Sequence, residues 1–278
     1  MKARDKDRFE IRASDRTRLF VRTWGEPSTA NAAIVLVHGL GEHIGRYEQL
    51  ARRFTERGFF LLAFDQRGHG RSKGKRGHIP STRQLMADIR QALLLAASFN
   101  PALPLFLYGH SMGALEVLYY ALKEQPDLAG VIATSPPLDD SVTSSGQETL
   151  TRLLNPVLPR VTVSNGIKQW ALSRDPAVAA AYQKDKLVHN KVSVRLGNFL
   201  IAGRRYVMDH AGGWQLPLYL AHGTADEVCP IRGSDLFFQN ASGPIKYMRW
   251  DGLYHETHNE PERARVIGTM LDWIEKQI

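Results

Sequence analysis

The chain has 278 residues, of which 43% are hydrophobic and 23% charged, and this balance is typical of a globular protein with one large domain and an insertion. No apolar run approaches the roughly 20 residues of a membrane span, and Met1–Arg8 lacks the apolar core of a signal sequence, so we expect a cytoplasmic protein. The single cysteine, Cys229, excludes an internal disulfide and argues against a cysteine-based metal site.

The net charge of +8 arises from 36 basic and 28 acidic residues that are scattered along the chain. Nucleic-acid binding is not expected, because it calls for basic residues gathered on one face together with a matching motif. The densest basic cluster lies in a glycine-rich loop, and its members are Arg67, Arg71, Lys73, Lys75 and Arg76. This cluster is either a solvated loop or a source of weak attraction to anionic lipid surfaces.

Taken in chain order, the predicted elements alternate between strands and helices. Strand-like runs lie at 9–13, 18–24, 34–38, 59–64, 105–109, 130–134, 217–221 and 245–250. Helix-like runs lie at 46–57, 83–99, 113–124, 232–240 and 262–276. Two opening strands without a helix between them, followed by strand–helix alternation, predict an α/β fold whose mainly parallel eight-stranded sheet has helices on both faces.

The alternation breaks between residues 137 and 213, where we expect a mostly helical cap inserted into a core formed by residues 1–136 and 214–278. Apolar side chains recur at helical spacing over 150–161, and a second apolar patch covers 196–201. These side chains either pack the cap onto the core or line a channel for an acyl chain, with an outer rim that touches lipid. Since a helix has two faces, both interpretations can hold.

The most informative motif is Gly109–Gly113, which has the G-x-S-x-G pattern of a nucleophile elbow. An apolar strand-like run precedes it at 105–108 and a helix-like run follows at 114–122, as this sharp turn requires. The turn should lift the Ser111 hydroxyl above the sheet edge and direct the Met112 N–H at a negative charge developing there. We therefore expect Ser111 to be a nucleophile, whereas a chance glycine–serine turn is the alternative.

A serine nucleophile needs a base, and the base needs an orienting acid that lies between the two in the chain order of this fold. We expect His255 to be the base, because it follows the strand-like run 245–250 and precedes a helix that Pro261 opens. Asp226 follows the apolar run 218–221 within an H-G-x-x-D pattern, and we expect it to accept a hydrogen bond from His255.

A third strand-to-turn transition supplies a candidate donor for the oxyanion of the reaction. The strand-like run 34–38 leads into His38–Gly41, whose two glycines let a backbone amide approach a ligand closely. We expect the Leu40 N–H to act beside the Met112 N–H as the second donor of an oxyanion hole. Alone, this segment would be interpreted as a plain turn.

Together these segments resemble the monoacylglycerol lipase family of the α/β-hydrolase superfamily. The resemblance runs from about residue 33 to the C-terminus and weakens between 137 and 215. It rests on His38–Tyr47 (HGLGEHIGRY), Phe64–Ser72 (FDQRGHGRS), Gly109–Gly113 (GHSMG), His222–Asp226 (HGTAD) and Tyr254–His258 (YHETH). One departure is Leu40, where some relatives carry alanine; a backbone donor tolerates this change, although the larger side chain narrows the site.

The resemblance implies an α/β-hydrolase that cleaves monoacylglycerols to a fatty acid and glycerol without a metal or organic cofactor. It also implies that a glutamate, an arginine and a histidine hold the glycerol end of the substrate, at positions that match Glu42, Arg46 and His258 here. A carboxylate and cationic donors suit hydroxyl groups. For Glu42 and Arg46 the alternative is a local surface ion pair of little energetic weight.

The sequence therefore predicts a serine hydrolase with the triad Ser111, Asp226 and His255, acting on a small lipid ester and contacting lipid surfaces transiently through the cap. A general carboxylesterase or lysophospholipase would share every catalytic residue. An acyltransferase would pass the acyl group to an alcohol instead of water. A receptor on this fold would bind a hydrophobic small molecule without turnover.

Overall fold

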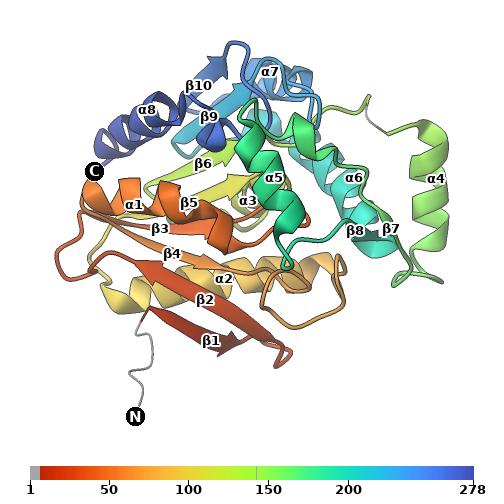
Figure 1. The fold of residues 1–278 in the computed structure, drawn as a ribbon, viewed down its shortest axis with the longest axis horizontal. Coiled ribbons are helices and arrows are strands. Elements are labelled where there is room, and N and C mark those ends of the chain that lie inside the picture. The colour runs from red at the N-terminus through yellow and green to blue at the C-terminus, as the bar shows by residue number, and fades with distance from the viewer. Residues whose placement is uncertain (1–6, 142) are drawn as a thin grey trace.

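The computed structural model describes residues 7–141 and 143–278, and its frame is one eight-stranded sheet (Figure 1). Residues 1–6, most of the segment in which we expect no signal sequence, lie outside the described residues. The strands lie side by side in the order β1 (Arg8–Arg12), β2 (Arg18–Trp24), β4 (Phe59–Phe64), β3 (Ala32–Val37), β5 (Leu105–His110), β6 (Gly130–Thr134), β9 (Leu218–Gly223) and β10 (Ile245–Trp250). β1, β2 and β4 pair antiparallel and the remaining neighbours pair parallel, so the predicted sheet is confirmed.

The central strands are continuous apolar runs because both faces of the sheet are covered. Every residue of β3 (AAIVLV) and of β4 (FFLLAF) is buried. Alternate side chains of β3 point to opposite faces, so Val35 belongs to one hydrophobic core and Ile34 to the other.

Helices cover both faces of the sheet, as the strand–helix alternation predicts (Figure 1). The first core packs under α2 (Thr82–Phe99), α3 (Met112–Glu124) and α7 (Arg232–Asn240). The second core packs under α1 (Glu48–Glu56) and α8 (Arg263–Glu275). The helix predicted at 46–57 is divided, since a 3₁₀ turn over Ile44–Tyr47 precedes α1.

The segment between β6 and β9, residues 135–217, is an insertion that leaves the sheet and returns to the neighbouring strand. It contains α4 (Ser145–Leu154), β7 (Thr162–Ser164), α5 (Pro176–Lys184), β8 (Lys191–Ser193) and α6 (Val194–Asp209). The pair β7–β8 and helix α5 were not expected, because the two strands have only three residues each and α5 lacks an apolar stripe. The three helices of the insertion are nevertheless longer than its two strands.

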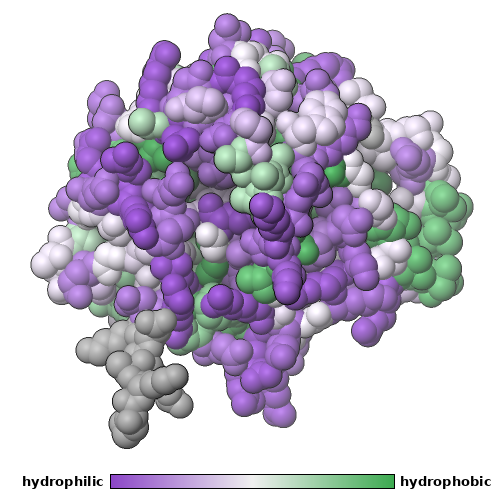
Figure 2. Space-filling model, in the orientation of Figure 1, coloured by the Kyte–Doolittle hydropathy of each residue, from purple (hydrophilic) through white to green (hydrophobic). Residues whose placement is uncertain are grey.

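The two apolar patches of the insertion differ in their surroundings. In α6, Leu196 and Phe199 are buried in the core that α3 also forms. In contrast, α4 has no buried residue, and Leu153 is 64% exposed. Figure 2 shows apolar side chains gathered at the right edge of the molecule, where Figure 1 places α4. Among the described residues, no helix is both long and apolar enough to cross a bilayer.

Candidate active site

The turn between β5 and α3 places Ser111 at the C-terminal edge of the sheet. Ser111 has a φ of 54° and a ψ of −120°, a strained backbone conformation for a residue with a side chain. The residues two positions before and after Ser111 must be glycines. A Cβ on Gly109 would lie 2.2 Å from the Gly113 carbonyl oxygen, and one on Gly113 would lie 2.1 Å from the Val37 carbonyl oxygen. The close strand–turn–helix packing expected from the motif is therefore present.

Three side chains from separate loops form one hydrogen-bonded chain at this turn. His255 Nε2 lies 2.9 Å from Ser111 Oγ, and His255 Nδ1 lies 2.7 Å from Asp226 Oδ2. Asp226 follows β9 and His255 follows β10, so the carboxyl ends of two paired parallel strands bring them together. Since the carboxylate accepts a hydrogen bond from Nδ1–H, the unprotonated Nε2 can accept a hydrogen bond from the serine hydroxyl.

The carboxylate of Asp226 is held by more than its histidine partner. Its Oδ1 accepts backbone hydrogen bonds from Val228 (2.8 Å) and Cys229 (2.9 Å). Burial raises the pKa of Asp226, but the positive charge of His255 and the hydrogen bonds from His222 and His255 outweigh burial and hold the pKa well below its usual range. Asp226 is therefore ionised at neutral pH.

His222 is a supporting residue that sequence reasoning missed. Its Nε2 lies 2.7 Å from the Cys229 carbonyl oxygen and 3.1 Å from Asp226 Oδ2, so this nitrogen carries the proton. Its Nδ1 lies 2.8 Å from Ser234 Oγ and accepts a hydrogen bond from this hydroxyl. The signal was present in the H-G-x-x-D pattern, whose first residue is His222.

The imidazole of His255 is buried and its pKa reflects two opposing effects. Burial lowers the pKa, whereas the carboxylate of Asp226, with smaller contributions from Glu256 and Glu42, raises it, and the net result lies above the ordinary histidine value. The loop that carries the ring is fixed by Ser135, whose hydroxyl donates a 2.7 Å hydrogen bond to the His255 carbonyl oxygen. These contacts give a positioned base beside the Ser111 hydroxyl.

The backbone amides of Leu40 and Met112 lie on the two turns that flank this site. Within the described residues, neither N–H donates a hydrogen bond, so both are free to donate to a ligand. The neighbouring Gly39 N–H is already used, because it donates a 2.6 Å hydrogen bond to Glu42 Oε1. His38 braces the same turn by donating from Nδ1 to the Gly39 carbonyl oxygen at 2.8 Å.

Glu42 and Arg46 form a buried ion pair, so the alternative of an exposed surface pair is wrong. Arg46 Nη1 lies 2.8 Å from Glu42 Oε2, with side chains that are 10% and 4% exposed. Sequence reasoning missed a second partner of Arg46, which is Glu256. Its carboxylate accepts hydrogen bonds from both terminal nitrogens of Arg46, at 2.5 and 2.8 Å. The guanidinium also lies over the Tyr182 ring of α5, at 4.9 Å. Two carboxylates and an arginine thus adjoin the Ser111 hydroxyl.

Among the described residues, His258 makes no hydrogen bond to these polar groups, although the charges of Glu256, Glu42 and Arg46 act on it. Its ring stacks on Tyr47 with centroids 5.1 Å apart and meets the His110 ring edge-on at 4.8 Å. Both ring nitrogens are buried without a hydrogen-bond partner among the described residues. His258 does not line the cavity beside Ser111, whereas Leu40, Glu42, Arg46 and His255 do. Its expected contact with substrate stays a prediction.

The cavity beside Ser111 is small, and the insertion forms one of its walls. Ile167, Leu172 and Tyr182 of the insertion face the catalytic loops across it. The centre of a water molecule can occupy about 10 Å³ of this cavity, which is room for about one water. The insertion also contacts the turn that carries Leu40, since the His189 N–H donates a 2.8 Å hydrogen bond to the Gly41 carbonyl oxygen.

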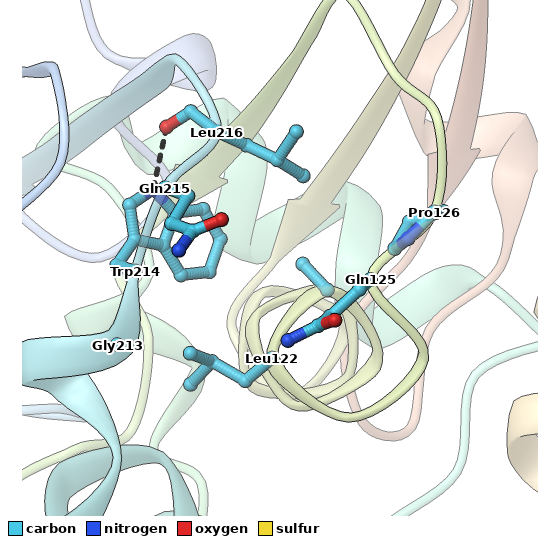
Figure 3. A pocket seen from close by; sticks show the side chains of 8 residues that line it. Leu122, Gln125, Pro126, Gly213, Trp214, Gln215 and Leu216 are labelled. Atoms are coloured by element: carbon cyan, nitrogen blue, oxygen red, sulfur yellow. Dashed lines mark hydrogen bonds between the residues drawn. The ribbon is translucent and has the colours of Figure 1, made fainter.

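A roomier hollow lies at the opposite end of α3 from Ser111 (Figure 3). It is formed by the C-terminal end of α3 and the segment before β9, with Leu122, Gln125 and Trp214 among its lining residues. None of the residues that line it belongs to the catalytic loops, so we assign this hollow no role in the reaction.

Comparison with known proteins identifies the family of the chain. Residues 28–262 match the family model described as serine aminopeptidase, S33. A monoacylglycerol lipase of Mycolicibacterium smegmatis is 34% identical over 261 residues, which cover 92% of each chain. The chain belongs to the monoacylglycerol lipase family.

Other members of the family and its fold agree with this placement. The rat monoglyceride lipase is 30% identical over 94% of this chain and 88% of its own. The crystal structure of the Paleococcus ferrophilus monoacylglycerol lipase superposes with a TM-score of 0.86 at 33% identity, covering 94% of this chain and 99% of that one. An abhydrolase domain-containing protein of Dictyostelium discoideum is 38% identical, and the chain spans only 28% of its length. The predicted α/β-hydrolase fold and family are confirmed.

Proposed function

We propose that this carboxylic ester hydrolase cleaves monoacylglycerols to a fatty acid and glycerol through an acyl-enzyme on Ser111. The observation that carries the proposal is the hydrogen-bonded chain from Ser111 Oγ through His255 to Asp226, set beside the buried Glu42–Arg46 pair. The family supports the substrate, since relatives at 30% identity or more are named monoacylglycerol and monoglyceride lipases.

In the first half of the proposed reaction, Ser111 Oγ attacks the ester carbonyl carbon while His255 Nε2 takes the hydroxyl proton. The Leu40 and Met112 amides donate to the oxyanion that forms, and each such donor contributes about 3 kcal/mol to transition-state stabilisation in related chemistry. The bond between the acyl carbon and the glycerol oxygen then breaks, and His255 donates the proton that it took from Ser111 to that oxygen.

In the second half, water attacks the acyl-enzyme. His255 takes a proton from the water, the same amides hold the second oxyanion, and the bond between the acyl carbon and Ser111 Oγ breaks. The proton passes to Ser111 Oγ, and the fatty acid leaves. The ionised Asp226 stabilises the imidazolium in both halves.

The glycerol end of the substrate is proposed to bind at Glu42 and Arg46. Glu42 Oε1 is occupied by the Gly39 N–H and the Tyr47 hydroxyl, at 2.6 and 2.7 Å, but Oε2 has a single partner. That oxygen can accept from a glycerol hydroxyl, and Arg46 can donate to one. A role for His258 requires that its ring be reached from the cavity.

We propose that residues 137–213 act as a cap that opens to admit the substrate. Support comes from the cavity beside Ser111, which has room for about one water and cannot hold an acyl chain. The exposed apolar side chains of α4 suit contact with a lipid surface, where such substrates reside. We therefore propose a cytoplasmic enzyme that contacts membranes peripherally through this insertion.

A matched substrate panel tests the proposed reaction. A medium-chain monoacylglycerol, the corresponding diacylglycerol and triacylglycerol, a lysophospholipid and a simple alkyl ester would be hydrolysed at pH 8, with Ser111→Ala as the blank. We expect a preference for the monoacylglycerol that Glu42→Gln weakens.

The panel also separates the alternatives. Equal or better hydrolysis of the alkyl ester would identify a general esterase, and preference for the lysophospholipid a lysophospholipase. Ester products formed with an added alcohol would reveal acyl transfer. Binding of the lipid without turnover by the unmodified chain would indicate a receptor.

A further inference from the structure

A basic hollow lies between the core and the insertion, lined by a different set of residues from the cavity beside Ser111. The loop after β4 contributes Lys75 and His78, while the insertion contributes Arg160 and Arg195. Water-sized centres can occupy about 350 Å³ of this hollow, far more than beside Ser111. The space is sufficient for a phosphate group with its hydration.

Of the four lysines and arginines that line this hollow, Arg67 is paired with Asp15 and Asp88, whereas Lys75, Arg160 and Arg195 have no carboxylate partner within the described residues. The Arg160 side chain makes no hydrogen bond or ion pair there, and Lys75 Nζ donates only to the Arg160 carbonyl oxygen at 2.6 Å. Arg195 donates to neutral oxygens of Asn155 and Pro80 at 2.9 to 3.2 Å. These bonds fix Arg195 without neutralising it and leave some of its five N–H groups free.

His78 reports the same excess of positive charge from inside the hollow. Burial lowers the pKa of His78, and the positive charges of Arg160, Arg195 and Lys75 lower it further. Its Nδ1 lies 3.0 Å from Ser193 Oγ, and this contact fixes the ring at the edge of the hollow. Three uncompensated cations on three separate chain segments therefore face one space, which is the arrangement that an anion would neutralise.

Apolar residues on either side of Arg160 limit which anion this hollow suits. Val157, Leu158 and Val161 are 71%, 48% and 46% exposed, and they continue the exposed apolar surface of α4. A free anion would gain nothing from these side chains. An anionic phospholipid offers both components, a phosphate for the cations and an acyl region for the apolar residues.

We propose that Lys75, Arg160 and Arg195 bind the phosphate of an anionic phospholipid head group while the adjacent apolar residues enter the lipid surface. This inference rests on the lipid contact proposed above and adds the head-group chemistry that selects the surface. Arginine and lysine suit the phosphate because they donate charge-assisted hydrogen bonds to its oxygens.

Co-sedimentation with vesicles tests the proposal. Vesicles of phosphatidylcholine, with and without phosphatidylglycerol, would be mixed with the full chain, with Lys75→Gln/Arg160→Gln, and with Lys246→Gln/Lys276→Gln. The last variant removes the same charge from exposed lysines on β10 and beyond α8, neither of which lines the hollow. We expect the first variant to weaken binding to phosphatidylglycerol vesicles by about tenfold or more and the control by less than about twofold.

Inorganic phosphate distinguishes the two sources of the anion. At matched ionic strength, phosphate should release the unmodified chain from phosphatidylglycerol vesicles more effectively than chloride does. Phosphate binding that depends on Lys75 and Arg160, without any preference for phosphatidylglycerol, would overturn the lipid assignment.

The remaining outcomes separate this inference from the lipid contact on which it rests. Equal losses in the two double variants would overturn the phosphate site and leave the lipid contact standing. No binding to either vesicle would overturn both. Unchanged hydrolysis of a soluble short-chain ester by Lys75→Gln/Arg160→Gln would show that the variant is folded.

Discussion

At the scale of single residues, the pH dependence of hydrolysis should follow the protonation of His255. The base must be neutral to take the Ser111 proton, and Asp226 raises its pKa above the ordinary value despite burial. Activity should therefore fall as the pH drops through this raised pKa, on the acid side of the profile.

Asp226→Asn should lower kcat/KM by about 10⁴-fold, because the amide no longer fixes the proper tautomer or stabilises the imidazolium. It should also move the acid limb to lower pH, since the largest contribution that raises the His255 pKa is removed. A pH–rate profile on a soluble ester checks both effects. Asp251→Asn, in the exposed turn after β10, should leave the profile unchanged, and an acid limb that stays in place in Asp226→Asn would contradict this account.

Glu256→Gln should raise KM for monoacylglycerol by several-fold, because Arg46 loses its two-point carboxylate partner and is held less firmly beside Glu42. A smaller shift of the acid limb to lower pH is also expected, since Glu256 contributes to the raised His255 pKa. Steady-state kinetics on monoacylglycerol and on an alkyl ester separate these effects. Glu227→Gln, an exposed neighbour of Asp226, is the control, and a KM increase of equal size on the alkyl ester would rule out a head-group role.

The sequence predicted the three residues of the hydrogen-bonded chain but not their buried supports. Strand-loop position located Ser111, Asp226 and His255, because parallel strands bring their carboxyl ends together. The position of a residue after a strand gives no information on the direction of its side chain, so the contact of Glu256 with Arg46 was missed. The spacing from His255 to His258 likewise left open which way the His258 ring points.

At the scale of elements, α4 is a helix whose apolar side chains are largely exposed. It has no buried residue, although its N-terminus is fixed by a capping box between Ser144 and Gln147. The side chains of Leu150 and Leu153 are 56% and 64% exposed, so they add little to the folded core.

Leu150→Ser/Leu153→Ser should change the free energy of unfolding by less than about 0.5 kcal/mol per site. Hydrolysis of monoacylglycerol in vesicles should fall several-fold, because the surface that enters lipid is lost, whereas hydrolysis of a soluble ester should not change. Leu94→Ser, at a 66% exposed site on α2, supplies the control. A parallel loss on both substrates would show that α4 matters for the fold instead.

The elements of the core could be predicted because the central strands are apolar runs and alternate with helix-like segments. The continuous burial of β3 and β4 follows from their sequences, AAIVLV and FFLLAF. Within the insertion these patterns are weak. The helix α5 is short and rich in alanine, and β7 and β8 depend on pairing between segments distant in sequence.

At the scale of the whole molecule, stability should depend on pH through Glu116. This residue lies on α3, is fully buried, and neither of its carboxyl oxygens has a hydrogen-bond partner among the described residues. Burial, and to a lesser degree the charge of Asp88, raises its pKa well above the ordinary value. The folded chain thus binds this proton more tightly than the unfolded chain does, and stability is lost as the pH rises through the folded pKa.

Glu116→Gln should remove this pH dependence, since the amide cannot ionise. The variant and the unmodified chain should have similar stabilities at pH 5. At pH 8 the variant should be more stable by about 1–3 kcal/mol, because unfolding of the unmodified chain is favoured there by ionisation of Glu116. Urea unfolding at the two pH values measures the difference. Glu124→Gln, at the end of the same helix, is the control, and an equal difference at both pH values would show that the pKa of Glu116 is the same in the folded and unfolded chains.

The two ends of the insertion begin from neighbouring strands, because β6 and β9 pair directly, with Val131 opposite Leu218. The pairing of these two strands therefore requires only that residues 135–217 bridge adjacent strands, although Ser135 also fixes the His255 loop and Leu196 and Phe199 also pack in the core. Selection can lengthen, shorten or replace this segment without disturbing the register that aligns Ser111, Asp226 and His255. The architecture separates the segment that we propose to contact lipid from the loops that carry the hydrogen-bonded chain, so substrate preference can change while those loops stay the same.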